Sequence, residues 1–491
     1  MSITSQYTNR IFTDKLEKWA LALLSLVVLG VIAYLSHLSP GLEGGMDSYN
    51  HYLIARYTWE YPYLFLDQWG KPLYNLLASP FVQFGINGAI VLNCVSLIGC
   101  SILVYCILLK IGINNAWLGY ILTLLSPIFL DNTISSLTEP LCALLVLLTL
   151  YFYIDKRYVL SAVMAGFLPF ARSEGFIILF VVFVFIVIIQ REYKAILYTA
   201  VGSILFNLLG WYIEGEPLWI FTSNPYIKFE MSGINICGRG DIYHYFRAGH
   251  YTFGKIASWL MVVGAIVYVI RWLRVSRIAD HAIGIILCSF TLYFASHAAI
   301  WWLGKMGSCG YVRVMVVIAP LASIIMTYGL HHLFLQLEQK LGDKLVLIQR
   351  GFMLFLLLNA IYTPYRYYAY KYPMQVSAEQ QEYHKLVDWM KSQPLDDRRK
   401  IYLYPYFSMI ADINPYNQEE HYDFWASSLQ FAEDGDILIW DGHFGPHESG
   451  TPLLSLEQDS TWKKIHAIVP KEKIVTLNDK AFEIHVFEKI K

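Results

Sequence analysis

The sequence has few charged residues: Asp, Glu, Lys and Arg make up only 15% of its 491 residues. Soluble domains usually carry about 25%, and disordered chains are poor in the hydrophobic residues that here make up 56%. The composition therefore excludes a soluble or a disordered protein for most of the chain. It predicts a protein that lies largely in lipid.

Several chemical signatures are also missing. We find no Walker-type Gly-x4-Gly-Lys-Ser/Thr motif and no convincing Rossmann fingerprint, so cytoplasmic nucleotide binding is not expected. No basic stripe with interleaved aromatic residues occurs, which argues against a nucleic-acid partner. There is no internal repeat of the kind that many transporters show.

A disulfide framework is absent as well, since there are only seven cysteines in the chain. Five of them lie in apolar stretches and are expected to be buried small hydrophobes. Cys237 and Cys309 fall in two polar loops predicted to lie on the same side of the membrane. They leave open two states, free thiols or a bridge formed in an oxidising compartment.

Charge divides the chain into two regions. Residues 375–491 contain 20 acids and 12 bases, a net charge of −8, whereas residues 1–374 contain 18 acids and 25 bases, a net charge of +7. We therefore predict a transmembrane domain over 1–365 and a soluble α/β domain over 366–491. In the second domain we expect helices at 378–392 and 421–431 and strands at 400–404, 436–440, 465–470 and 482–488.

The first region holds apolar runs long enough to cross a bilayer. They predict a multi-pass α-helical protein with about eleven transmembrane helices, at 19–34, 87–109, 116–130, 138–154, 158–171, 175–190, 195–213, 254–272, 281–302, 312–335 and 345–362. The run at 19–34 follows Arg10, Lys15 and Lys18 but has no cleavage site after it, so we expect it to be retained.

Dense Lys/Arg clusters all fall on one side when the helices alternate from a cytoplasmic N-terminus. This predicts the inner (cytoplasmic) membrane and an extracytoplasmic C-terminal domain. The unusual polar residues of the membrane region then all lie on the outer face. Because acids near hydrocarbon are costly, such residues are expected to face a cavity or a partner.

The first outer loop carries Asp47 and His51, which share a helix face at i,i+4. Asp47 has two interpretations: a general base for an acceptor hydroxyl, or the N-cap of a helix at 48–58. Lys71 adds a cation further along this loop, just before an interfacial helix predicted at 72–84.

Three more motifs lie on this face. Glu139 opens a helix and is either part of a capping box with Ser136 or a carboxylate that binds a sugar hydroxyl or a metal. Arg172 and Glu174 either pair with each other or leave Arg172 to hold a phosphate. Lys305 and Arg313 flank a small-residue loop and form a candidate anion site, with Lys305 an interfacial anchor in the alternative. In the tail, the segment 440–448 is either a metal site or, more simply, a polar turn.

Taken in order, these motifs resemble the GT-C superfamily of integral-membrane glycosyltransferases, and in particular bacterial relatives of dolichyl-phosphate-mannose mannosyltransferases. The resemblance covers about 1–365. Its motifs are Gly-Gly-Met-Asp at 44–47, Lys-Pro-Leu-Tyr at 71–74, Thr-Glu-Pro-Leu at 138–141, Ala-Arg-Ser-Glu-Gly at 171–175 and Gly-Tyr-Val-Arg at 310–313.

The resemblance implies an inverting transfer of a sugar from a polyprenyl-phosphate carrier to a glycan, lipid or protein acceptor at the outer face. Asp47 would be the catalytic base, Glu139 would assist it, and Arg172 and Arg313 would hold the lipid phosphate. His51, Lys71, Glu174 and Lys305 are further candidate substrate-binding residues.

Metal dependence stays open at this point. Ser48 and Tyr49 follow Asp47, so the first loop has no Asp-x-Asp motif. A divalent cation, Mg²⁺ or Mn²⁺, is therefore an expectation without an assigned ligand set.

Three other functions compete with a transferase. A flippase or transporter of lipid-linked sugars would favour charges in the middle of helices and inverted repeats. A polysaccharide polymerase or ligase would also use outer-loop Arg residues but would not need the acid in the first loop. A non-catalytic scaffold for polysaccharide assembly would tolerate the loss of Asp47.

Overall fold

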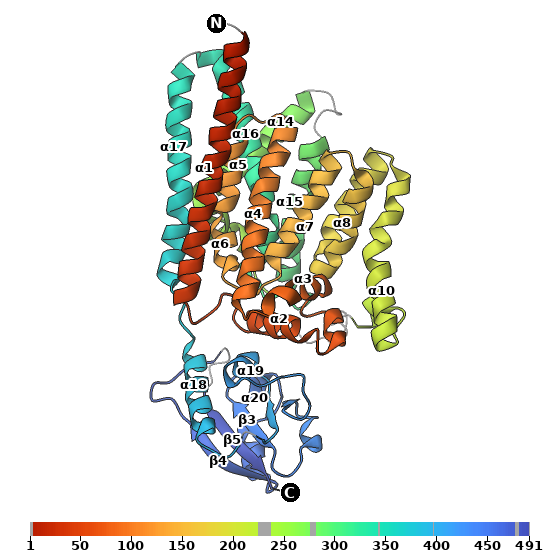
Figure 1. Ribbon diagram of the computed structural model, residues 1–491, viewed down its shortest axis with the longest axis vertical. Coiled ribbons are helices and arrows are strands. Elements are labelled where there is room, and N and C mark those ends of the chain that lie inside the picture. The colour runs from red at the N-terminus through yellow and green to blue at the C-terminus, as the bar shows by residue number, and fades with distance from the viewer. Residues whose placement is uncertain are drawn as a thin grey trace.

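The computed structural model describes residues 3–223, 237–274, 281–341, 344–395, 397–476 and 481–490. A bundle of helices forms the first part of the chain, and a small α/β region hangs from one end of it (Figure 1). The N-terminus lies at the far end of the bundle and the C-terminus at the tip of the α/β region.

Within the described part of the chain, seven helical stretches are long and apolar enough to cross a membrane: 15–38, 87–110, 193–214, 244–273, 281–303, 312–338 and 346–371. Their main helices are α1 (Ile3–Leu38), α4 (Asn87–Lys110), α10 (Val201–Glu214), α14 (Lys255–Arg274), α15 (His281–Leu303), α16 (Ala319–Leu341) and α17 (Lys344–Tyr368). Three shorter apolar stretches contain α7 (Glu139–Ile154), α8 (Tyr158–Ala171) and α9 (Gly175–Phe183).

One of the eleven predicted spans is interrupted by non-helical residues. The run 116–130 is divided into α5 (Ala116–Leu124) and α6 (Pro127–Thr133). Pro127 has no backbone N–H to continue the helix, and it stands in the first turn of the second one. The break therefore follows from the chemistry of proline.

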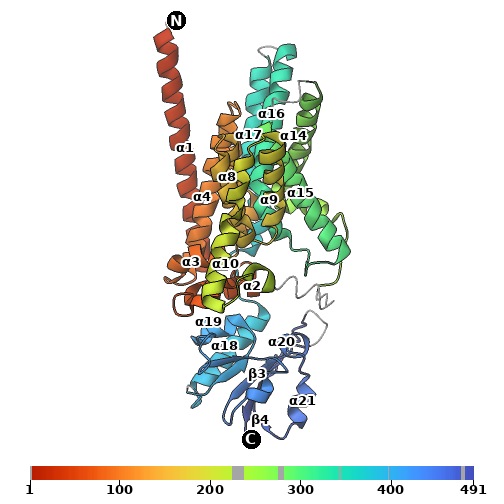
Figure 2. The same cartoon turned by 90° about the vertical axis from the view of Figure 1, so that its right-hand side faces the viewer.

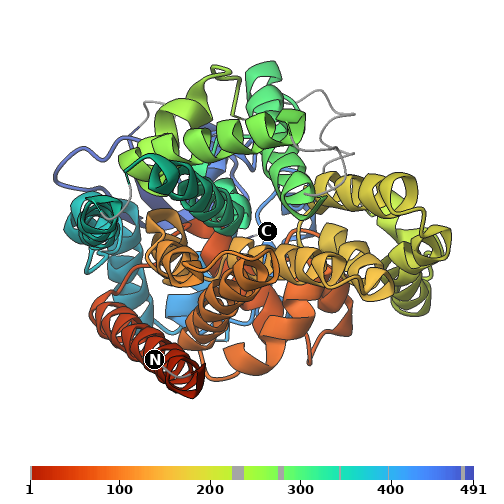
Figure 3. The same ribbon diagram turned by 90° about the horizontal axis from the view of Figure 1, so that it is seen from above.

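The spans differ in how much of their surface the bundle covers. In an apolar 18-residue window of the stretch 312–338, 94% of the residues are buried, whereas the corresponding share is only 22% in 15–38 and in 346–371. α16 therefore lies inside the bundle, and α1 and α17 lie at its edge, as the view from above shows (Figure 3). The apolar outer faces of these edge helices are suited to lipid.

Two short helices, α2 (Met46–Tyr57) and α3 (Pro72–Val82), lie across the bundle end that faces the α/β region (Figures 1 and 2). The helix predicted at 72–84 is found as α3, and its placement at the membrane interface stays a prediction. The remaining helices of this region are short: α11 (Trp219–Thr222) and α13 (His244–Gly249), with the 3-10 or π turns η1 (Pro62–Leu66), η2 (Val184–Ile189), η3 (Tyr193–Ala200), η4 (His250–Gly254), η5 (Val312–Ile318) and η6 (Ala369–Lys371).

The α/β region contains a five-stranded sheet of order β2-β1-β3-β5-β4. β2 and β3 run parallel to β1, and β5 runs antiparallel to both β3 and β4. The strands are β1 (Lys400–Tyr402), β2 (His421–Asp423), β3 (Ile437–Asp441), β4 (Trp462–Ile468) and β5 (Ile484–Lys489), and the helices are α18 (Ala378–Lys391), α19 (Pro405–Ala411), α20 (Phe444–His447) and α21 (Leu453–Gln458), with η7 (Leu429–Phe431).

The predicted helix at 378–392 and all four predicted strands are confirmed. The predicted helix at 421–431 is wrong, because this segment starts with edge strand β2, paired in register with Lys400–Tyr402. Aromatic residues such as Tyr422, Phe424 and Trp425 favour extended structure, and pairing with β1 decides the outcome.

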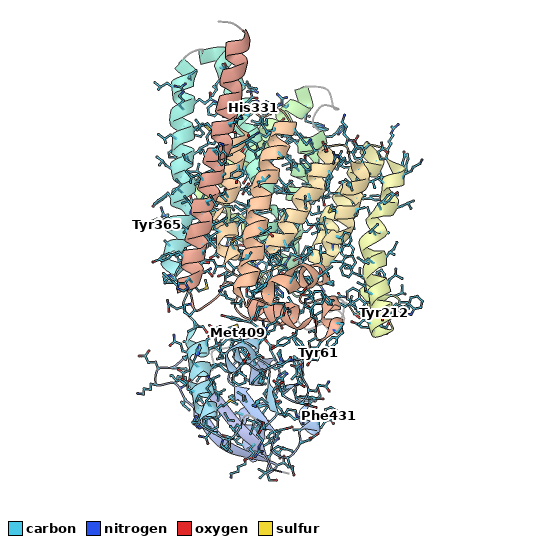
Figure 4. The ribbon with its side chains drawn as sticks, in the orientation of Figure 1. Tyr61, Tyr212, His331, Tyr365, Met409 and Phe431 are labelled. Atoms are coloured by element: carbon cyan, nitrogen blue, oxygen red, sulfur yellow. A yellow bond between two sulfur atoms is a disulfide. The ribbon has the colours of Figure 1, made fainter. Side chains whose placement is uncertain are left out.

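The two regions are joined by packing as well as by the chain. Tyr49 of α2 contacts Tyr406 of α19, with ring centroids 4.8 Å apart. Figure 4 shows Tyr61 and Met409 at this junction. α17 runs to Tyr368, beyond the predicted boundary at 365, and the division into two domains stays a prediction.

Cys237 and Cys309 are joined in a disulfide, so the bridged alternative is the one found.

Candidate functional site

Asp47 stands in the first turn of α2, where its side chain faces another element and does not cap the helix. The N-cap is Gly45, which has a φ of 53° and leaves α2 without a side-chain cap. The N-cap interpretation of Asp47 is therefore wrong. Its carboxylate instead forms an ion pair with the guanidinium of Arg313, 266 residues away in the sequence.

Arg313 is the second residue of η5 and bridges two acids. Besides Asp47, its Nε lies 3.5 Å from Oε1 of Glu139. Its Nη1 donates to the carbonyl oxygen of Gly44 at 3.4 Å, and its guanidinium lies 4.5 Å from the ring centroid of Tyr311. These contacts fix the guanidinium beside the loop that leads into α2.

Glu139 is the first residue of α7, and here too the capping interpretation is wrong. The N-cap is Thr138, and no side chain caps the helix. Oε1 of Glu139 lies 2.8 Å from Nη1 of Arg172 and also contacts Arg313. A single buried carboxylate thus holds two guanidinium groups.

Arg172 also pairs with Glu174, as one of its two interpretations predicted, with Nη2 2.8 Å from Oε1. It donates a further bond to Thr138 Oγ1 at 2.9 Å. The five side chains Asp47, Arg313, Glu139, Arg172 and Glu174 therefore form one continuous row of ion pairs, which we call the acid–guanidinium row.

Exposure differs sharply along this row. The side chain of Asp47 is 22% exposed, whereas that of Glu139 is 1% exposed. An incoming hydroxyl can reach Asp47 more readily than Glu139. Glu139 is placed to hold both Arg side chains rather than to meet a substrate directly.

His51 lies one turn after Asp47 and is buried beside the row. Its Nδ1 is 3.2 Å from the carbonyl oxygen of Ser136. Burial lowers the pKa of His51 to about 4, against the opposing effect of Asp47 and Glu139, so the ring is neutral at pH 7. The positive charges of Lys71 and Arg313 also lower the pKa of this ring, so both cations lie near it.

Lys71 is buried, and its Nζ donates to the carbonyl oxygen of Gln68 at 2.8 Å. It lines a narrow recess with Ser173, Phe176 and Trp219. Lys305 lies elsewhere: it is exposed in the loop after α15, and none of the ion pairs of the acid–guanidinium row includes it.

Sequence reasoning missed two parts of this surround. His297 of α15 lies 3.9 Å from Glu174, and its signal was a lone histidine in an apolar run. Lys371, just after α17, pairs with both Glu43 and Asp131, which fixes the loop leading to Asp47. Nothing in the spacing of these three residues indicated that they meet.

A divalent metal would need several oxygen ligands that converge on one point. Over the described ranges, no group of three or more His, Cys, Asp or Glu side chains is arranged to hold a metal ion. Asp47 and Glu139 are bridged by Arg313, so a cation occupies the space between the two carboxylates. These residues do not fit Mg²⁺ or Mn²⁺ in this arrangement, and we route no chemical step through a metal.

No protein-family model matches the sequence, and no curated protein matches it. Solved structures do match. The crystal structure of ArnT from Cupriavidus metallidurans bound to undecaprenyl phosphate aligns with a TM-score of 0.58 and 9% identity, over 96% of this chain and 98% of that chain. The apo state of ArnT gives the same score over 95% and 97%.

The Archaeoglobus fulgidus oligosaccharyltransferase, crystallised with Zn and sulfate, aligns with a TM-score of 0.52 and 13% identity, over 90% of this chain and 72% of that chain. The likeness to mannosyltransferases stays a prediction. With its apolar helices, the chain is an integral membrane protein, and it has the multi-pass GT-C-like fold with a small C-terminal α/β region that its motifs predicted.

Proposed function

We propose that this protein is a glycosyltransferase that moves a sugar from a polyprenyl-phosphate carrier to an acceptor hydroxyl. We place the reaction at the bundle end beneath the α/β region, on the extracytoplasmic side of the inner membrane. The observation that carries the proposal is the position of Asp47: its carboxylate is 22% exposed and lies beside Arg313, which also contacts the buried Glu139, in a fold shared with a protein crystallised with undecaprenyl phosphate.

In the proposed reaction, Asp47 accepts the proton of the acceptor hydroxyl. The hydroxyl oxygen forms a bond to the anomeric carbon of the donor sugar from the face opposite the phosphate. The bond between that carbon and the phosphate oxygen breaks, the phosphate keeps the electron pair, and the configuration inverts. Each proton and each electron pair has a destination without a further reactant.

Cations have to stabilise the charge that grows on the leaving phosphate. Arg313 and Lys71 suit this role because Arg313 lies beside Asp47 and Lys71 lines the recess next to Ser173. Arg172 already contacts two carboxylates and a hydroxyl, so its proposed role is to orient Glu139 and Glu174 as well as to add positive charge. His51 is neutral and buried, which suits a hydrogen bond within the site rather than a charge on the phosphate.

The test compares wild type with Asp47→Asn in purified, full-length protein. Labelled polyprenyl-phosphate sugars are offered with a panel of glycan, lipid and protein acceptors, and product is quantified. We expect Asp47→Asn to lower the transfer rate by roughly 10²–10⁴-fold, because a positioned base is lost. Asp388→Asn, the same change at an exposed acid of α18, is the matched control and should leave transfer unchanged.

Two outcomes would contradict the proposal. If Asp47→Asn transfers at the wild-type rate, Asp47 is not the base. If wild type in sealed vesicles moves lipid-linked sugars across the bilayer but forms no product with any acceptor, the protein is a transporter.

A further inference from the structure

A second cavity lies away from the acid–guanidinium row, between η4 and the first turn of α14 on one side and the last turns of α17 on the other. Its volume is about 490 Å³, and it shares no lining residue with the recess at Lys71. Its walls include His250, Lys255, Thr363, Arg366 and Tyr367. These residues come from two segments more than a hundred positions apart.

The cavity stands at the bundle end where the proposed reaction takes place. α17 ends there and leads into α18, as Figure 1 shows, and α14 begins there. Exposed tyrosines surround this level of α17, among them Tyr362, Tyr365 and Tyr370, and Figure 4 shows Tyr365 pointing outward. Tyrosine is enriched where hydrocarbon meets head groups, so the cavity lies at the depth of lipid head groups.

The cavity carries positive charge from Lys255 and Arg366. Lys255 and Arg366 form no ion pair with any of the residues that the structure describes, and Arg366 only lies over the ring of Tyr367, 5.8 Å from its centroid. Glu43 and Asp131 are acids whose charges lie close to Tyr368. Both of them form ion pairs with Lys371. Two cations at one cavity thus lack a counter-ion among the described residues.

The shape of the lining is fixed by hydrogen bonds within the protein. Tyr368 donates to the carbonyl oxygen of Tyr251 at 3.1 Å, which ties α17 to η4 beside the cavity. Thr363 donates to the carbonyl oxygen of Asn359 at 2.7 Å, and Nδ1 of His250 lies 2.5 Å from the carbonyl oxygen of Arg247. The backbone segments that carry the two cations are therefore held in place by hydrogen bonds within the protein.

We propose that this cavity binds the phosphate-bearing head group of an anionic membrane lipid, separately from the donor site. Lys255 and Arg366 hold the phosphate, with Arg366 able to do so bidentately. The volume falls in the range of roughly 300–1,000 Å³ typical of small-molecule sites, so it holds a whole head group rather than a phosphate ion alone. Ile256 and the tyrosine rings give the upper acyl chain an apolar wall.

The test measures binding, so it does not depend on the proposed transfer reaction. Purified full-length protein in zwitterionic detergent is titrated with phosphatidylglycerol that carries a fluorophore at the end of an acyl chain, and anisotropy is recorded. The double variant Lys255→Gln, Arg366→Gln should raise the Kd by about 10–100-fold, since charge-assisted hydrogen bonds to phosphate are lost. The conservative variant Lys255→Arg keeps both positive charges and leaves Arg366 intact, so its Kd should stay within about 3-fold of wild type.

Arg350→Gln is the matched control, because it removes an exposed cation from the opposite half of α17. It should change the Kd by less than about 2-fold. Thermal unfolding of each variant shows that it is folded under the binding conditions.

Three results would overturn the proposal. The first is a double variant that binds the probe as wild type does. The second is equal competition by unlabelled phosphatidylcholine, which would mean that the acyl chain alone is bound. The third is that inorganic phosphate displaces the probe at the same concentration as unlabelled phosphatidylglycerol does. That result would make this a site for a free anion.

Discussion

The two regions of the molecule bury carboxylates in different ways. In the membrane region, Glu139 contacts two guanidinium groups through Oε1, while its Oε2 and Nε of Arg172 have no hydrogen-bond partner among the residues that the structure describes. In the α/β region, Asp441 accepts from Tyr383 Oη at 2.7 Å and from the backbone nitrogens of His443 and Phe444 at 2.8 and 2.7 Å. One acid sits among charges with spare hydrogen-bonding capacity, and the other is satisfied by neutral donors.

The difference separates a site from a structural turn. Buried polar atoms without partners are costly, and in native structures they point to a ligand or a catalytic role. A saturated carboxylate that organises its own turn has no capacity left for a ligand. The segment 440–448 is therefore the polar turn that was its simpler interpretation, and the acid–guanidinium row is the better candidate for chemistry.

Glu139→Gln gives the largest expected effect and tests the comparison most directly. Removing one charge from a buried network leaves guanidinium groups without their shared partner, which costs about 3–5 kcal/mol of unfolding free energy. Thermal unfolding in detergent measures this loss. The control Glu457→Gln removes a half-exposed partner of Lys464 and should cost under about 1 kcal/mol; an equal loss in both variants would contradict the role of Glu139.

Asp441→Asn sharpens the comparison from the other side. The amide cannot accept from all three donors at once, so we expect a loss of about 1–3 kcal/mol. Because this acid shapes a turn, transfer per folded molecule should equal that of wild type. A selective loss of transfer with unchanged unfolding temperature would place Asp441 in the site.

The pH dependence of the free energy of unfolding tests whether the His51 ring beside the acid–guanidinium row is neutral. Burial lowers its pKa to about 4, so below pH 6.5 the unfolded chain takes up a proton that the folded chain does not. The free energy of unfolding should therefore fall by about 2 kcal/mol between pH 7 and pH 5 on account of this group. His51→Gln should remove that part of the pH dependence, and unfolding scans of both proteins at the two pH values check it.

His443 should change the free energy of unfolding in the opposite direction with pH. Its hydrogen bond to Glu379, 3.0 Å from Nδ1, raises its pKa against the effect of burial. This pair stabilises the fold below the unfolded pKa of about 6.5, and the contribution is lost as the pH rises through the raised folded value. Both partners are partly exposed, so Glu379→Gln should change unfolding at pH 6 by less than about 1 kcal/mol and at pH 9 not at all.

Much of this arrangement could be predicted from local chemistry. Alternating the helices by charge brought Asp47, Glu139, Arg172 and Arg313 to one face, and the row confirms that they lie together. Ser377 and Gln380 form the capping box that begins α18. Pro127 indicates a break between α5 and α6, but the continuous apolar run favoured a single span.

The pairings themselves could not be predicted, because they depend on contacts between distant segments. Ser136 and Glu139 have the spacing of a capping box, yet a guanidinium from η5 and another from the turn after α8 take the carboxylate instead. An ion pair in a low-dielectric interior outweighs a backbone hydrogen bond that other groups can replace. Lys371 met Glu43 and Asp131 only through the packing of α17 against α6.

α2 belongs to both halves of the protein at once. Tyr49 is part of the hydrophobic core of the α/β region, whereas Tyr52, Leu53 and Ala55 pack with α3 and α4. Asp47 thus lies on a helix that packs against both regions. A chain cut after the last membrane helix would lose more than an appendage: it would strip Tyr49 of its cover and loosen the carboxylate on which the proposed reaction depends.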